Sequence, residues 1–254
     1  MGRVLTRGLD AVVRNPVETL VPALLFGALP TSLVGYLHDA VLMDVVSWLG
    51  ELRGELTLWF AVYVLGSITN LLVQGAVTRA VLAHREDARS TLWETMRPAL
   101  QRLPALALTG LAVGVVTLLT GLLMIVPGLL LFVVSSLVGP VLVEERRSVF
   151  GSLRRSCTLW RSAPALTLGV NLMLIFGYLL FSVLLVMGGV LLWHGVDAGD
   201  AETLSPLPVS FHLASALPIA LASAIWAAII AQLYGELRDR VDGRPSDRLA
   251  AIFA

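Results

Sequence analysis

The stretch LPALALTGLAVGVVTLLTGLLMIVPGLLLFVVSSLVGPVLV, from Leu103 to Val143, contains no charged residue. As a helix rising about 1.5 Å per residue, it is too long for one crossing of a hydrocarbon core of about 30 Å. The IVPG sequence at 125–128 divides it, because proline ends a helix and glycine tolerates a reversal of the chain. We therefore expect two apolar segments, 104–125 and 128–143, which either both span a membrane or form a re-entrant hairpin.

Four further apolar runs are long enough to cross a membrane: 17–37, 57–82, 164–192 and 207–235. The chain is 57% hydrophobic and only 14% charged, whereas soluble domains carry about 25% charged residues. The sequence therefore predicts an all-α integral membrane protein. We expect a single membrane domain over residues 1–254, built as a bundle of six transmembrane helices with short amphipathic helices at the interface.

The distribution of arginine predicts how this bundle is oriented. All 18 basic residues are arginine, and all but Arg53 lie near the two ends of the chain or in the connections after the second and fourth runs. The positive-inside rule places these segments, both termini and a tail at 236–254 in the cytoplasm. Exclusive use of arginine is typical of a GC-rich bacterium, so we expect the inner membrane of a bacterial cell.

Two cytoplasmic segments, 1–15 and 144–162, are predicted to be amphipathic helices lying on the membrane, and a third is expected on the outer side at 44–55. In the second of them, apolar residues recur at helical spacing with arginines along the edge. We expect the arginines to contact anionic lipid headgroups; they are Arg147, Arg154, Arg155 and Arg161. A catalytic alternative would need a nucleophile or metal ligands converging with a base, which this stretch does not supply.

The same region carries a family resemblance. IVPG is followed by Pro140, Glu144, Ser148, the LRRS sequence at 153–156 and Leu159. This pattern resembles the signature of the glycerophosphoryl diester phosphodiesterase membrane-domain family, and Asn15-Pro16 is similar to the family's N-terminal segment. The resemblance implies a six-helix membrane bundle. It does not imply phosphodiesterase chemistry, because the catalytic barrel of the fused enzymes is a separate soluble domain.

A polar stripe runs along one face of the second apolar run, formed by Tyr63, Ser67, Asn70, Gln74 and Thr78. Polar side chains at membrane depth commonly hydrogen-bond neighbouring helices, which would make the stripe a packing device. Alternatively, the stripe lines a path for a solute or lipid. A second pattern, a small-residue face on the third apolar run, similarly allows either close packing within the bundle or dimerisation; its residues are Gly110, Gly114, Thr117 and Gly121.

The sequence offers no residues for several chemistries. We find no acid or base near the middle of the bilayer, where ion-coupled transporters usually carry one, and no cofactor motif or nucleic-acid signature. His194, Asp197, Asp200 and Glu202 share an outer loop, but their spacing matches no metal site.

We expect a non-enzymatic multi-pass membrane protein that organises or partners envelope components. Its expected partners are the lipid bilayer with its anionic headgroups, and another membrane protein or a second copy. The alternative is a transporter or lipid-handling protein that moves a neutral solute or lipid through the bundle.

Overall fold

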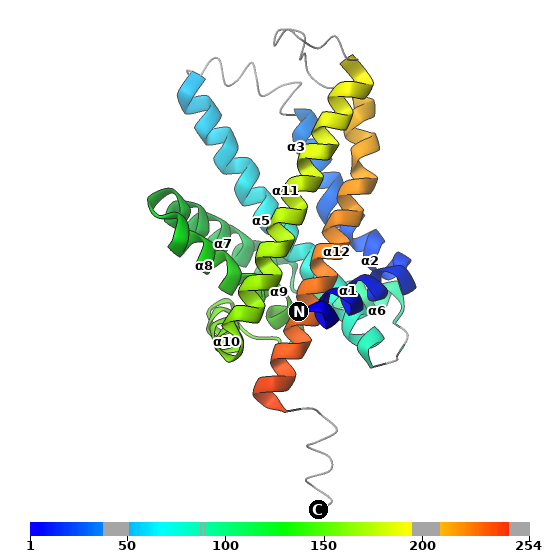
Figure 1. Cartoon of the computed structure of the whole chain (residues 1–254), viewed down its shortest axis with the longest axis vertical. Coiled ribbons are helices and arrows are strands. Elements are labelled where there is room, and N and C mark those ends of the chain that lie inside the picture. Colours follow the sequence, from blue (N-terminus) through cyan, green and yellow to red (C-terminus); the bar gives the residue numbers. More distant parts are fainter. Residues whose placement is uncertain (38–50, 87, 89, 195–208, 244–254) are drawn as a thin grey trace, which may run out of the picture.

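The computed structural model describes residues 1–37, 51–86, 88, 90–194 and 209–243, and these residues form helices without a strand (Figure 1). Of the outer helix predicted at 44–55, residues 44–50 lie outside the described residues, while 51–55 belong to the long helix that begins at Glu51. The acidic loop at 195–208 also lies outside the described residues. Six helical segments are long and apolar enough to cross a membrane, which confirms the predicted fold. They are α2–η1–α3 (Pro16–Ala23, Leu24–Ala28, Leu29–Leu37), α5 (Glu51–Arg85), α7 (Leu103–Leu123), α8–α9 (Ile125–Ser135, Val138–Glu144), α11 (Pro164–His194) and α12 (Val209–Asp242).

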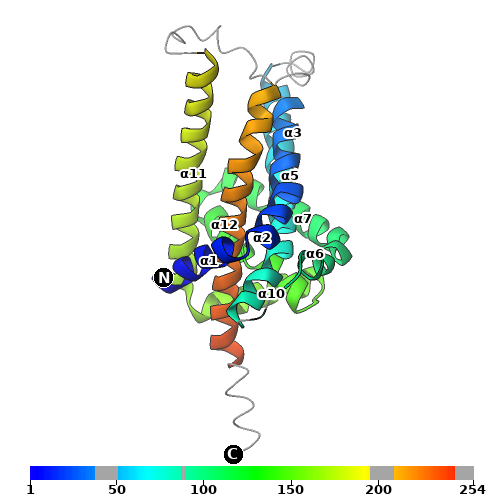
Figure 2. The ribbon, with the colours of Figure 1, turned by 90° about the vertical axis from the view of Figure 1, so that its right-hand side faces the viewer.

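Three amphipathic helices lie at one end of the bundle, which we call the arginine-rich end: α1 (Gly2–Arg14), α6 (Leu92–Gln101) and α10 (Val149–Ser162). The two views show them near the lower part of the bundle, with α1 crosswise to the long helices (Figures 1 and 2). α1 and α10 match the interfacial helices predicted at 1–15 and 144–162. α6 was not predicted; it begins with a capping box formed by Thr91 and Glu94.

The reversal at IVPG occurs earlier than predicted. The chain turns at Met124, whose backbone is extended, and Pro127 then occupies the first turn of α8, where its missing N–H breaks no helical hydrogen bond. Gly128 serves packing rather than the turn, because a Cβ on it would lie 2.5 Å from the Cα of Gly121 in α7. The prediction that Pro127 ends the helix was therefore wrong, and Gly128 instead lets α7 and α8 close tightly.

The α7–α8 hairpin covers only part of the bundle. In both views its turn lies well below the upper ends of α5, α11 and α12 (Figures 1 and 2). Below the hairpin the chain breaks again at Ser136 and Leu137, between α8 and α9. Pro140 explains this break, since proline cannot donate the hydrogen bond that a continuous helix would make to the carbonyl of Ser136. The predicted segment 128–143 is thus two short helices, α8 and α9, joined at this break.

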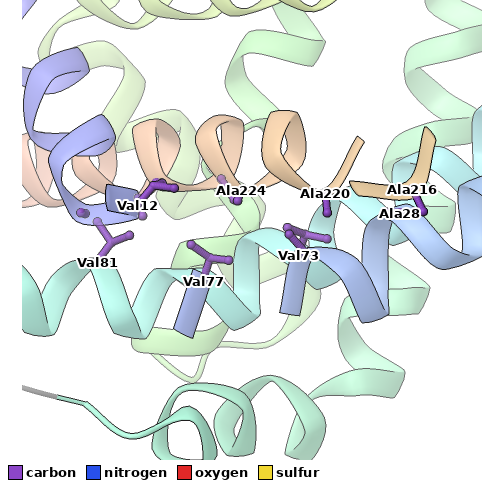
Figure 3. Packing of buried hydrophobic residues seen from close by; sticks show 13 residues of the cluster. Val12, Ala28, Val73, Val77, Val81, Ala216, Ala220 and Ala224 are labelled. Atoms are coloured by element: carbon purple, nitrogen blue, oxygen red, sulfur yellow. The ribbon is translucent and has the colours of Figure 1, made fainter. Parts of the chain in front are cut away.

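Close backbone packing holds the centre of the bundle together. α12 presents a face of alanines, among them Ala216, Ala220 and Ala224, to the valines at 73, 77 and 81 of α5 and to Val12 of α1 (Figure 3). Small side chains allow helices in a membrane to approach closely. The same principle joins α7 to α5, because a Cβ on Gly110 would lie 2.6 Å from the Cα of Ile68. The small-residue face of α7 is therefore occupied within the bundle.

α12 continues beyond the predicted end at residue 235, so the first residues of the predicted tail 236–254 are helical up to Asp242. Hydropathy alone marks the end at Glu236, where charged residues begin. The helix persists because Leu237 is buried and because charged side chains pair across single turns, as Arg240 does with Glu236 at 3.3 Å.

Candidate functional site

A partly open cavity of 810 Å³ lies among α3, α5, α7, α8, α11 and α12, within the range of about 300–1,000 Å³ typical of ligand pockets. Tyr63, Ser67, Asn70 and Gln74 of α5 line it. The fifth residue of the predicted stripe, Thr78, lies beyond the cavity, and its hydroxyl donates to the carbonyl of Gln74 at 2.5 Å. The structure thus brings four of the five predicted stripe residues to one cavity.

Part of the stripe also serves packing. The amide of Gln74 donates to Asn70 Oδ1 at 3.2 Å, so two stripe residues partner each other within α5. The other end of the Gln74 amide rests on α9, where a Cβ on Gly139 would lie 2.9 Å from Oε1. Gln74 therefore closes the lower end of the cavity, and Asn70, Ser67 and Tyr63 follow above it along α5.

Two irregular helical segments meet this cavity. The π-helical turn η1 contributes Gly27, and the break between α8 and α9 contributes Ser135 and Ser136. Both serine hydroxyls donate to carbonyls one turn back in α8, at 2.9 and 2.8 Å. Irregular backbone at membrane depth is tolerated where it is buried in protein or lines a cavity, and π-helical turns are frequent at functional sites. Their coincidence here marks the cavity as a built feature of the fold.

The wall opposite the stripe is aromatic. Trp226 of α12 makes edge-to-face contacts with Phe132 and Tyr178, at centroid distances of 6.2 and 6.1 Å. All three line the cavity. The indole N–H of Trp226 and the hydroxyl of Thr117 are buried and find no hydrogen-bond partner within the described part of the chain. Such groups are costly to bury unpaired.

No charged side chain is among the described residues that line the cavity. The polar groups there are hydroxyls, carboxamides and one indole N–H, contributed by α5, α7, α8, α11 and α12 and by Thr31 of α3. Such a lining can donate and accept hydrogen bonds, but it supplies neither a general acid or base near neutral pH nor a counter-ion for a charged ligand.

The four arginines predicted to contact lipid headgroups divide into two groups. Arg155 does not lie where the prediction placed it. Its side chain is only 11% exposed, and it pairs with Glu145 at 3.0 Å and with Asp242 of α12. Burial alone would lower the pKa of this guanidinium, but the hydrogen bonds to the two carboxylates raise the pKa above its ordinary value. Arg155 therefore connects α10 to α9 and α12 instead of facing lipid.

Arg154 and Arg161 lie on the exposed face of α10, and Arg147 is half exposed while pairing with Glu145 at 2.7 Å. For these three the headgroup contact stays a prediction. The acid that pairs with Arg147 and Arg155 is Glu145. Glu144 instead lies 3.5 Å from Arg79 of α5, so the adjacent acids fasten two different helices.

The described residues include no group of three His, Cys, Asp or Glu side chains that could hold a metal ion. The predicted acidic loop with Asp197, Asp200 and Glu202 lies outside them.

Six apolar helices of membrane-spanning length make this chain a multi-pass membrane protein. Comparison of the chain with known protein families, with curated proteins and with solved structures finds no match in any of the three. The resemblance to the glycerophosphoryl diester phosphodiesterase membrane-domain family therefore stays a prediction.

Proposed function

We propose that this protein binds a small uncharged molecule in the cavity and handles it inside the bilayer, as a lipid-handling or solute-transporting protein of a bacterial inner membrane. The observation that carries the proposal is the position of the α5 stripe: Tyr63, Ser67 and Asn70 line a cavity, although Ser67 also packs on Gly114 of α7.

The physical argument rests on the cost of polar groups at membrane depth. Burying a polar side chain in an apolar environment without a hydrogen-bond partner costs up to several kcal/mol of free energy. Here a stripe from α5, two serines at a helix break and an unpartnered hydroxyl of Thr117 all border one space. The hydroxyls of both serines already donate to carbonyls of α8, and the Thr117 hydroxyl is sealed off from this space. A bound molecule with hydrogen-bonding groups would therefore pair with the stripe residues Tyr63, Ser67 and Asn70, whereas a purely structural bundle would be more stable with apolar residues in their place.

The organising role expected from the sequence has less support from a specific contact. Dimerisation through Gly110 and Gly114, one way in which a second copy could bind, meets the finding that both residues pack on Ile68 and Ser67 of α5 within the described structure. We therefore favour ligand handling over the role of a membrane organiser.

Two glycines offer a matched test. A Cβ on Gly66 or on Gly177 would meet nothing within 4 Å, but only Gly66 lines the cavity, while Gly177 lies on the exposed face of α11. We expect the wild type and Gly177→Phe, released from nanodiscs in native mass spectrometry, to retain a bound small molecule. Gly66→Phe should retain at least about tenfold less, because the ring would occupy space inside the cavity. Equal retention by all three proteins would refute ligand binding in the cavity.

A further inference from the structure

The cavity has an exposed side, formed by α5 and α11. Five of the described residues that line it are exposed, and four of these belong to the two helices: Tyr63 and Gly66 of α5, and Tyr178 and Leu179 of α11. We call these four residues the rim. The fifth exposed residue, Thr31, belongs to α3, which lies on the side of the bundle away from α11 (Figure 2).

The rim helices have different neighbours. α11 packs on α8, α10 and α12, while α5 packs on α7, α12 and η1. The upper halves of α5 and α11 stand apart in both views (Figures 1 and 2). The α7–α8 hairpin borders the cavity through Val113 and Phe132, but its turn lies below the upper ends of α5 and α11. The rim therefore frames a lateral opening that the described part of the chain leaves uncovered.

The rim lies at the depth of the hydrocarbon core. On α5, Tyr63 is sixteen residues from the exposed Arg79, which corresponds to about 24 Å along a helix rising about 1.5 Å per residue. On α11, Tyr178 is fourteen residues from Pro164, where the apolar span begins, or about 21 Å. Both lengths are shorter than a hydrocarbon core of about 30 Å, and the surface beside the rim is apolar, with Leu180 exposed. The opening therefore faces lipid rather than water.

From the position of this opening we infer that the ligand enters the cavity sideways from the bilayer, between α5 and α11, and is an uncharged molecule dissolved in the lipid phase. The inference rests on the proposed function, to which it adds the route of entry and the class of the ligand. A water-soluble solute would have to leave water for hydrocarbon before it reached the rim, which is costly for its polar groups. A molecule already dissolved in the bilayer meets no such barrier.

Two photoreactive probes that carry the same diazirine but differ in solubility test the entrance: a long-chain alcohol, which dissolves in the bilayer, and a monosaccharide, which stays in water. The full-length protein in nanodiscs is illuminated with either probe, and the labelled residues are identified by mass spectrometry. Ser223 and Trp226 report the cavity, while Leu213 and Leu217 report the exposed surface of the same helix, α12. We expect the alcohol to label the two cavity residues at least about tenfold more than the sugar does.

Leu179→Trp and Leu180→Trp are matched variants, because both leucines are exposed on α11 but only Leu179 lines the cavity. The larger side chain in Leu179→Trp narrows the rim. It should lower the alcohol labelling of the two cavity residues, relative to the two exposed leucines of α12, at least about fivefold. Leu180→Trp should change this ratio less than about twofold.

Three results would overturn the inferred entrance. Cavity labelling by the sugar that equals or exceeds labelling by the alcohol would overturn entry from the bilayer. Equal labelling ratios in the two tryptophan variants would overturn the route between α5 and α11, and absence of cavity labelling by both probes would overturn the entrance as a whole. The retention test with Gly66→Phe and Gly177→Phe uses no added probe, so it shows separately whether the cavity binds a ligand.

Discussion

Arg155 Nε donates to Glu145 Oε1 at 3.0 Å, which ties the middle of α10 to the C-terminal end of α9. The same guanidinium contacts Asp242 at the end of α12, and the hydroxyl of Tyr234 donates to Glu145 at 3.3 Å. One arginine therefore joins the consecutive helices α9 and α10 to the C-terminal end of α12, which is distant in sequence.

We predict that Arg155→Gln destabilises the protein by about 1–3 kcal/mol, because it removes a partly buried guanidinium that bonds both Glu145 and Asp242, although Glu145 keeps Arg147 and Asp242 keeps Arg238. Arg155→Lys should recover only part of this loss, since an ammonium cannot bond both carboxylates with a planar fork. Arg154→Gln is the control on the exposed face of α10 and should have little effect. Thermal unfolding in detergent measures all three, and equal stability of the two Gln variants would contradict the structural role.

Substitution by alanine should affect the stability of the protein in opposite directions at two glycines of α7. Gly110→Ala should destabilise the bundle by about 1–3 kcal/mol, because the added Cβ would lie 2.6 Å from the backbone of Ile68 and the helices must separate. Gly121→Ala should be neutral or stabilising by up to about 1 kcal/mol, because its Cβ meets nothing within 4 Å and alanine favours the helix. Comparable losses in unfolding experiments would show that close approach is not what Gly110 provides.

The apolar runs and the stripe could be predicted from the sequence because each depends on a local property, namely run length or helical spacing. Tyr63 to Gln74 lie on one face by geometry alone. What that face meets depends on other helices, so the sequence left packing and cavity lining undecided. The burial of Arg155 could not be predicted for the same reason, because its partners Glu145 and Asp242 are brought to it by the packing of other helices. The helix break at Ser135 and Ser136 could have been predicted, because two adjacent serines interrupt an apolar run shortly before Pro140.

The capping box of α6 predicts a specific response to pH. The backbone N–H of Thr91 donates to Glu94 at 2.9 Å, and this bond, followed by the bond with the Thr91 side chain, lowers the pKa of Glu94. The capping contribution should therefore be constant above the carboxyl's unfolded pKa of about 4.3 and should disappear as the pH falls through the lower folded pKa. Hydrogen exchange at the start of α6 measures this. Glu94→Gln should remove the pH dependence, and an unchanged dependence in that variant would contradict the assignment.

Single cysteines test the predicted orientation, in a Cys157→Ser background. Cysteines at Ser90 and Arg154 should be shielded from a membrane-impermeant thiol reagent in intact cells, because the positive-inside rule places both in the cytoplasm. A cysteine at Gly54 should react. Labelling at Ser90 in intact cells, together with protection at Gly54, would invert the orientation.

The last prediction concerns Arg154 and Arg161, which lie on the exposed face of α10. If they attract anionic headgroups, each contributes about 1 kcal/mol, and salt weakens the attraction because the Debye length falls from about 10 Å at 0.1 M to about 3 Å at 1 M. Hydrogen exchange of α10 should therefore be slower in anionic than in zwitterionic nanodiscs at low salt, and the difference should vanish at 1 M salt. Replacing both arginines by glutamine should abolish the difference, whereas replacing both by lysine should preserve it, since headgroup attraction requires charge more than a planar fork. The Arg155 network does not depend on lipid, so it should hold α10 in place in every variant. Equal exchange of the wild type in the two lipid compositions would show that these arginines do not contact headgroups.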